Sequence, residues 1–210
     1  MPATSDLFNG PVSVMLAKTQ DTIPRPGPGG GLAFEPKWDG YRGCLQMHPD
    51  GTIRLWSRNG TNLSDAFPDL VEAARLQIPA GLVLDGEVVV LVEGRLSFDH
   101  LQHRMVSSPS AAARLARSHP ASYVAFDILA VGGRDVRGLR WRDRRMLLDE
   151  LADGFTPPLQ VSPVTEDYET ASEWFATLTA MGVEGLVIKS VASRYVPAER
   201  GWVRRSNAES

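Results

Sequence analysis

The sequence reads Glu35-Pro36-Lys37-Trp38-Asp39-Gly40-Tyr41-Arg42 where two apolar segments meet. Asp-Gly is a dipeptide typical of turns between strands, and apolar residues lie on both sides of this one. We therefore predict strands at 32–36 and 41–48, joined by a turn region. This arrangement would hold Lys37 close to an acid and an arginine.

Lys37 could act as a nucleophile only after losing its proton. A lysine with an ordinary pKa of about 10.4 is only ~0.1% neutral near pH 7.4. Cationic neighbours, a metal and partial burial can lower that pKa into the working range. The run is therefore a candidate site for covalent lysine chemistry, although a surface hairpin with mixed charges would show the same pattern.

The composition suits one globular domain with a substantial core: 210 residues, 43% hydrophobic and 22% charged. The formal charge of −3 gives no overall basic field for nucleic acid, but a local basic face remains possible. The single cysteine, Cys44, fits a reducing compartment and a buried position in a strand. No apolar run reaches ~20 residues and no signal layout opens the chain, so we expect a cytoplasmic protein without a membrane partner.

The rest of the chain alternates strands with helices, without regular strand–helix–strand repeats. Residues 1–31 form a loop-rich lead-in that includes the Pro- and Gly-rich stretch 24–31. Further strands are expected at 52–57, 82–92 (interrupted at 85–87), 122–131, 159–164, 185–191 and 201–205. Helices are expected at 67–77, 97–106, 110–117, 141–152 and 168–181. This order predicts an α+β fold with antiparallel sheets.

Several charged residues lie in or beside these strands, namely Asp85, Glu87, Asp127, Glu184 and Lys189. Asp85 and Glu87 are two residues apart and so share one face of a strand. Each charge alone could be an edge-strand feature. Together they predict a cleft in which carboxylates hold a metal such as Mg²⁺, cations neutralise phosphates, and Phe126 stacks on a base.

Motif by motif, the sequence resembles the ATP-dependent DNA ligases of the covalent nucleotidyltransferase superfamily. The matching segments are 35–42 (motif I), Ser57-Arg58-Asn59-Gly60, Leu84-Asp85-Gly86-Glu87 (motif III), 123–129 (motif IIIa), 184–189 (motif IV) and 195–205 (motif V). Their order and spacing also match, over roughly residues 10–205. The closest similarity is to the small bacterial ligases and the ligase modules of bacterial end joining.

This resemblance implies an α+β, antiparallel-sheet nucleotidyltransferase (ATP-grasp-like) domain with flanking helices at 32–205, followed by a polar tail at 206–210. Lys37 would attack the α-phosphorus of ATP and form lysyl-AMP. Asp39 would position Lys37 or a metal-bound water. Arg42 would contact the ribose and later the nick, and Lys189 would contact the α-phosphate.

The resemblance also implies the remaining contacts to nucleotide, metal and DNA. Glu35 would help to read the adenine edge, and Phe126 would stack on adenine. Glu87 would contact the ribose and later the nick, and with Glu184 it would bind Mg²⁺ or Mn²⁺. Arg204 would contact the α-phosphate.

The implied macromolecular partner is nicked double-stranded DNA, whose 5′-phosphate Arg58 would hold. In the family reaction the enzyme is adenylated, AMP moves to the 5′-phosphate, and the 3′-hydroxyl displaces AMP. That reaction would serve DNA repair, recombination or replication. We expect the protein to be a monomer.

Two features depart from the family pattern. Motif V usually carries two lysines or a lysine and an arginine, whereas here Arg204 replaces the first and Ser206 the second. The usual Pro-Gly before it is Pro197-Ala198. We also expect the OB-fold domain to be absent from this chain, which stops at Ser210; an excised adenylation domain and a naturally short protein both fit this ending. The isolated chain should then self-adenylate slowly and bind DNA weakly, unless an OB-fold domain or protein is supplied separately.

Other interpretations remain open. The chain could bind nucleotide without turnover, or it could use the same covalent chemistry on RNA ends or with GTP. His100 and His103 lie three residues apart, and two ligands are too few for zinc, so surface or packing roles are expected. Residues 142, 144 and 145 are arginines that could face a nucleic-acid backbone or simply solvent.

Overall fold

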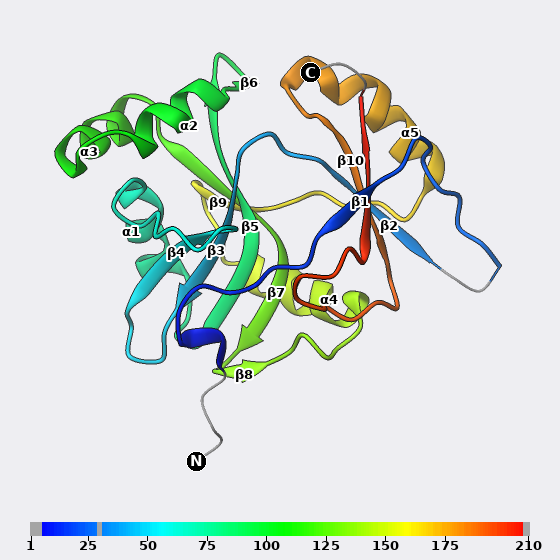
Figure 1. Ribbon diagram of the computed structural model, residues 1–210, viewed down its shortest axis with the longest axis horizontal. Helices are drawn as coiled ribbons and strands as arrows, with labels where there is room; N and C mark the ends of the chain where they lie inside the picture. The colour runs from blue at the N-terminus through cyan, green and yellow to red at the C-terminus, as the bar shows by residue number, and fades with distance from the viewer. Residues whose placement is uncertain (1–5, 29–30, 208–210) are drawn as a thin grey trace.

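The computed structural model describes residues 6–28 and 31–207, whose strands form two sheets that meet in the middle of the molecule (Figure 1). The strands are β1 (Ala17–Thr19), β2 (Leu32–Pro36), β3 (Tyr41–Met47), β4 (Ile53–Ser57), β5 (Leu82–Val92), β6 (Arg95–Leu96), β7 (Ala121–Val131), β8 (Arg134–Asp135), β9 (Leu159–Val161), β10 (Gly185–Ser190) and β11 (Trp202–Ser206). The helices are η1 (Asp6–Phe8), α1 (Pro68–Gln77), α2 (Phe98–Met105), α3 (Pro109–Ser118), α4 (Trp141–Ala152), α5 (Tyr168–Thr177) and η2 (Leu178–Met181).

The larger sheet has the order β4-β3-β5-β7-β8, with β6 beside β5 and β9 beside β7. Helices α1, α2 and α4 contact this sheet and bury its apolar side chains. The main core lies between them and includes Leu45, Leu55, Leu84, Phe67 and Leu70, each with at most 1% of its surface exposed. Burial of this apolar face is what holds the strands in register.

The smaller sheet has the order β1-β11-β10-β2, and α5 covers one of its faces (Figure 1). Strand β2 pairs antiparallel with β10, so that Phe34 lies opposite Ile188. Both side chains pack with Leu186 and Ala171 of α5 in a second core. The chain then leaves β2 and enters β3 of the larger sheet, so residues 37–40 connect the two sheets.

Gly40 is required at this connection. A Cβ atom at this position would collide with the carbonyl oxygen of Val88 in β5. The absence of a side chain therefore allows the backbone to pass close to the larger sheet and brings Lys37 to the junction.

The predicted α+β fold with antiparallel sheets is confirmed, with two exceptions to the pairing: β1 runs parallel to β11, and β9 runs parallel to β7. Strand β5 continues through residues 85–87, where we expected an interruption. The strand expected at 159–164 ends at Val161, before Pro163, which has no N–H to donate. The helix expected at 168–181 ends at Thr177 and continues as the 3₁₀ turn η2.

The lead-in is more ordered than predicted. It supplies η1 and β1, and it buries Leu7, Phe8 and Met15 against the larger sheet. These apolar residues were visible in the sequence, but their spacing matches neither a helix nor a strand. Of the Pro- and Gly-rich stretch, residues 24–28 and 31 form no helix or strand, and 29–30 lie outside the described residues.

Cys44 is buried in β3 and is not in a disulfide, as expected. Among the described residues, no helix has the length and apolar character needed to cross a bilayer.

Candidate active site

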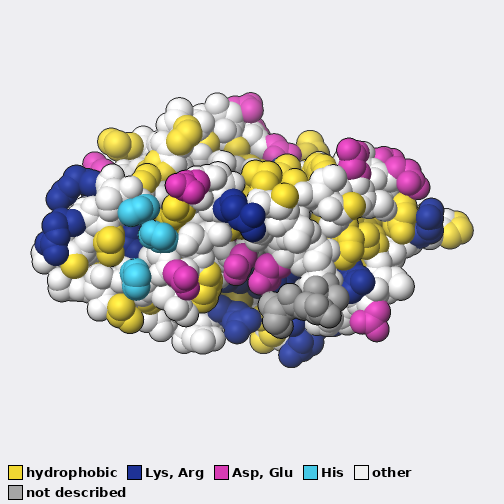
Figure 2. Space-filling model, turned by 90° about the horizontal axis from the view of Figure 1, so that it is seen from above, with side chains coloured by type: hydrophobic (Ala, Val, Ile, Leu, Met, Phe, Trp, Pro, Cys, Tyr) yellow, Lys and Arg dark blue, Asp and Glu magenta, His cyan; other side chains and the backbone are white. Residues whose placement is uncertain are grey.

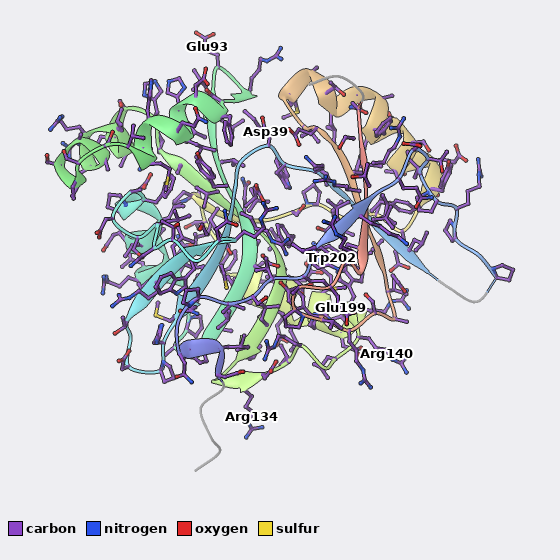
Figure 3. All side chains as sticks on the ribbon, viewed as in Figure 1. Asp39, Glu93, Arg134, Arg140, Glu199 and Trp202 are labelled. Carbon is purple, nitrogen blue, oxygen red and sulfur yellow. The ribbon has the colours of Figure 1, made fainter. Side chains whose placement is uncertain are left out.

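A cavity of about 330 Å³ lies where the two sheets meet. Its lining residues come from β1, β2, β3, β5, β7, β10 and β11 and from the loops beside them: Leu16, Ala17, Glu35, Pro36, Lys37, Trp38, Arg42, Arg58, Glu87, Phe126, Val187, Lys189, Arg200, Trp202 and Arg204. Figure 3 shows Trp202 in the middle of the molecule, with Asp39 above it on the loop between β2 and β3. The cavity thus combines cations, carboxylates and three aromatic side chains.

Lys37 enters this cavity from the end of β2. Its backbone N–H donates to the carbonyl of Gly185 (2.8 Å), and the N–H of Glu184 donates to the carbonyl of Lys37 (2.9 Å). The Lys37 ammonium also forms an ion pair with the Glu184 carboxylate. Burial and the nearby Arg204 lower the pKa of Lys37, while Glu87 and Asp39 oppose this effect. Lys37 is therefore held in place and shifted towards the neutral, nucleophilic form.

Glu87 is the second carboxyl group close to Lys37. Burial raises its pKa to about 8; Arg42 and Lys37 oppose this rise, and Asp85 adds to it. At this pKa, Glu87 is largely protonated near neutral pH. A cation bound against it would have to displace that proton.

Arg42 is fixed by the buried carboxylate of Asp85. It donates from Nε (2.9 Å) and Nη2 (2.6 Å) to the two oxygens, and the Tyr195 hydroxyl donates to Oδ2 (2.7 Å). The guanidinium carbon also lies 5.4 Å from the ring centre of Phe126 and 5.2 Å from that of Trp202. The spacing of Asp85 and Glu87 predicts that they share a face of the strand, but the sequence does not identify Arg42 and Tyr195 as the partners of Asp85.

Lys189 and Glu35 form a buried ion pair at the inner end of the cavity. The ammonium lies 3.0 Å from each carboxylate oxygen and is aligned for a hydrogen bond with Oε2. It also donates to the carbonyl of Phe126 (3.0 Å) and lies 4.4 Å from the ring centre of Trp202. Burial raises the pKa of Glu35, whereas Lys189 and Arg145 lower it.

Three exposed arginines lie among the lining residues: Arg58, Arg200 and Arg204. The Arg204 Nε donates to the hydroxyl of Thr19, which faces it across the β1–β11 pair (3.0 Å). Arg200 was not identified from the sequence, because nothing in its local pattern distinguishes it from other loop arginines. These side chains give the cavity the positive charge that a polyphosphate requires.

The structure brings together most of the predicted site residues. Among the cavity-lining residues are Glu35, Lys37, Arg42, Arg58, Glu87, Phe126, Lys189 and Arg204. Glu184 is not a lining residue but contacts Lys37. Asp39 also lies outside the lining set, and its charge raises the pKa of Lys37.

Asp127 does not contribute to the cleft as we had predicted. It is buried on the other side of β7, where its carboxylate accepts hydrogen bonds from Nε and Nη2 of Arg144 (2.7 and 3.0 Å). Neighbouring residues of a strand point to opposite faces, so Phe126 faces the cavity and Asp127 faces α4.

The prediction that the arginines at 142, 144 and 145 face nucleic acid or solvent is wrong for two of the three. Arg144 is fully buried, and Arg145 has only 10% of its side chain exposed. Arg142 alone is exposed, and it pairs with Glu166 (2.7 Å).

Histidine side chains gather on one face of the molecule (Figure 2). His100 lies 4.5 Å from His119 and 6.5 Å from His103, measured between ring centres. Within the described part of the chain, no group of three or more His, Cys, Asp or Glu residues could hold a metal ion.

The family model of the ATP-dependent DNA ligase domain matches residues 14–204. The chain belongs to the ATP-dependent DNA ligase domain family. DNA ligase C2 of Mycolicibacterium smegmatis is 36% identical over 190 residues, which cover 90% of this chain and 52% of the relative. The bifunctional non-homologous end joining protein LigD of Bacillus subtilis is 32% identical over 190 residues, covering 83% of this chain and 31% of that protein.

A solved structure agrees with this assignment. Mycobacterial DNA ligase D, complexed with ATP and MES, superposes with a TM-score of 0.75 and 31% identity, covering 94% of this chain and 61% of that chain. The nucleotidyltransferase fold and the membership of this ligase family are therefore established. The chain spans about half the length of the first curated relatives it matches.

Proposed function

We propose that this chain is the adenylation domain of an ATP-dependent DNA ligase. Lys37 Nζ attacks the α-phosphorus of ATP, a nitrogen–phosphorus bond forms, and pyrophosphate leaves with the electrons of the broken phosphorus–oxygen bond. The observation that carries this proposal is the position of Lys37, which is mostly buried in a cavity shared with Lys189, Arg204 and Phe126. A lysine, two phosphate-neutralising cations and an aromatic platform are the groups this reaction needs.

The cavity has the size of a small-molecule site, since such pockets start at about 300 Å³. Adenine would stack on Phe126, with Val187 beside it and Glu35 at its polar edge. Arg42 and Glu87 would contact the ribose. Lys189 would then leave Glu35 and, with Arg204, bind the α-phosphate.

Lys37 must lose both its proton and its ionic partner before it attacks. The lowered pKa supports the first step, because a larger fraction of the amine is neutral at a given pH. The ion pair with Glu184 favours the ammonium, so the amine must turn away from this carboxylate towards phosphorus. Asp39 is close enough to influence the charge of Lys37 and would help to position it.

A Mg²⁺ ion fits this arrangement as a partner of the triphosphate, with Mn²⁺ as a substitute. Mg²⁺ is commonly held by one or two carboxylates together with phosphates and waters. Glu184 contacts Lys37 directly, and Glu87 is close enough to perturb its pKa. Bound there, the metal would neutralise charge that develops on the phosphates. Glu87 would release its proton and Glu184 its ion pair with Lys37.

The activity of the whole protein follows from the same proposal. AMP would pass to the 5′-phosphate of nicked double-stranded DNA, held by Arg58, and the nick would be sealed in repair, including end joining. An OB-fold domain or protein would complete the DNA grip. We place this reaction in the cytoplasm, in a monomer, and we assign adenylation to residues 32–205; these points remain predictions.

The decisive test is the mass of the intact chain after incubation with ATP and Mg²⁺. We expect a gain of one AMP, mapped to the peptide that contains Lys37. The chain has three lysines, and the exposed Lys18 provides the matched control. Lys37→Ala should abolish the adduct and Lys18→Ala should retain it. An unmodified wild-type chain would favour a nucleotide-binding module, and a gain of GMP from GTP would favour a different nucleotidyltransferase.

A further inference from the structure

Arg145 of α4 is a mostly buried arginine that donates hydrogen bonds from two of its three nitrogens. Its Nε donates to Asp149 (2.8 Å), and its Nη2 donates to the backbone carbonyl of Ser162 (3.0 Å). Its Nη1 is buried and has no hydrogen-bond partner among the described residues. This atom lies 3.9 Å from Oε1 of Glu35, which also lacks a hydrogen-bond partner there. A buried donor and a buried acceptor thus face each other just beyond bonding distance.

Glu35 has two counter-ions, and only one of them stays in place in the proposed reaction. The Lys189 ammonium holds the carboxylate at 3.0 Å. Under the proposed function, the same ammonium moves to the α-phosphate of ATP. Glu35 has only 2% of its surface exposed, and among residues 6–28 and 31–207 it would then retain Arg145 as its only cation within 4 Å. A buried carboxylate without a counter-ion takes up a proton.

We propose that Arg145 is a positioning residue for base recognition: it keeps the Glu35 carboxylate ionised and aimed at the base when the nucleotide takes Lys189. This inference rests on the proposed function. Arg145 is suited to the role because its guanidinium stays charged and is anchored at two points, to Asp149 and to Ser162.

The ionisation of Glu35 determines which base fits. A carboxylate only accepts hydrogen bonds, so it pairs with the exocyclic amino group of adenine. Guanine places a carbonyl oxygen at the same position and would be repelled by the negative charge. A protonated Glu35 could donate to that oxygen. Loss of Arg145 should therefore weaken ATP binding and also reduce the preference for ATP over GTP.

The other charges around Glu35 define the expected pH dependence. Lys189 of β10 and Arg145 of α4 favour the carboxylate, whereas Asp127 of β7 favours the protonated form. Without Arg145, the pKa of Glu35 rises further. ATP affinity is lost as the pH falls through that pKa, so the midpoint of the loss should move to higher pH.

The experiment uses calorimetry on the full chain to measure Kd for ATP and for GTP from pH 6 to 9. EDTA is present to prevent nucleotidyl transfer to Lys37. For Arg145→Gln we expect about tenfold weaker ATP binding at pH 7, because the ionised fraction of Glu35 falls about tenfold for each unit by which its pKa rises. We also expect ATP binding to recover at higher pH. At low pH, the ratio of the affinity for ATP to the affinity for GTP should be smaller than in the wild type. Arg142→Gln, on the same helix but in an exposed pair, should match the wild type. ATP itself also takes up protons as the pH falls, but this contribution is the same for the wild type and all variants.

Two further variants separate positioning from folding. Asp149→Ala removes the anchor of Arg145 at an exposed residue and should give a smaller shift in the same direction, even if Arg145→Gln does not fold. In a Glu35→Gln background, Arg145→Gln should cause no further pH shift. The inference would be overturned if both Arg145→Gln and Asp149→Ala kept the wild-type pH midpoint of ATP binding and the wild-type ratio of ATP affinity to GTP affinity. A wild-type chain that binds neither nucleotide would instead overturn the proposed function and this inference with it.

Discussion

Lys37 and Glu184 are joined twice, through a backbone hydrogen bond of 2.9 Å from the N–H of Glu184 to the carbonyl of Lys37 and through an ion pair of their side chains. The first contact extends the β2–β10 pairing by one step. The second holds the amine beside a carboxylate. The position of Lys37 is therefore fixed by sheet pairing, while its charge is set by the groups around it.

Self-adenylation should accelerate as the pH rises, because attack requires the neutral form of Lys37. Arg204 lowers the pKa of Lys37, so Arg204→Gln should raise this pKa and move the midpoint of the pH–rate profile to higher pH. Below that midpoint the rate should fall by about tenfold for each unit by which the pKa rises. The measurement is the single-turnover rate of AMP transfer from pH 6 to 10.

The neighbouring Arg205 provides the control for that experiment. It points away from the cavity and lies 5.3 Å from the ring centre of Phe175. Arg205→Gln should leave the midpoint unchanged. Equal midpoints for the wild type and Arg204→Gln would show that Arg204 does not set the ionisation of Lys37.

Asp85→Asn should strongly destabilise the fold. The carboxylate is fully buried and accepts hydrogen bonds from Arg42 and Tyr195. Removing its charge leaves the Arg42 guanidinium without a counter-ion, which costs about 3–5 kcal/mol in comparable buried pairs. The free energy of unfolding in urea measures the loss. Tyr195→Phe removes two hydrogen bonds, one donated to Asp85 and one accepted from the N–H of Met15, and should cost about 2 kcal/mol. A loss no larger than this for Asp85→Asn would contradict the importance of the ion pair.

Ala198→Gly should stabilise the protein. Ala198 adopts φ +61°, a left-handed conformation that costs a residue with a Cβ roughly 1–2 kcal/mol. Glycine removes this strain but adds entropy to the unfolded chain, so a net gain of about 0.5–1 kcal/mol is expected. Thermal unfolding will measure it. Ala192→Gly, in the same loop without positive φ, should be neutral or destabilising, and a gain there as large as at 198 would argue against the strain explanation.

Phe126→Leu should weaken ATP binding with little effect on the fold. The ring is partly exposed in the cavity and lies edge-on to Trp202 at 6.0 Å. Loss of one aromatic stacking contact is worth about 0.5–1.5 kcal/mol, or roughly two- to tenfold in Kd. Phe175→Leu, on α5 outside the cavity lining, is the control. Unchanged ATP affinity in Phe126→Leu would remove this residue from the base site.

Local patterns in the sequence were sufficient to predict the fold class and most of the helices and strands. The strands at 32–36 and 41–48 and the helix at 141–152 follow from apolar spacing and turn residues, which act over a few neighbours. The order of the motifs also predicts Lys37, Phe126 and Lys189 as residues of one site, and all three line the cavity. The apolar lead-in was missed because its buried residues follow no regular period.

The pairing of charges was decided only by the tertiary structure. Alternation along β7 sends Phe126 to the cavity and Asp127 to Arg144, but the sequence does not state which face meets which layer. The contacts of Asp85 with Arg42 and Tyr195, and of Glu35 with Lys189 and Arg145, join residues on different elements. The local sequence around a charged residue does not identify its ion-pair partner, because the partner depends on burial and on the register between distant strands. The sequence thus determined which chemical groups are present and on which local elements they lie, and the packing of two sheets determined which of them meet.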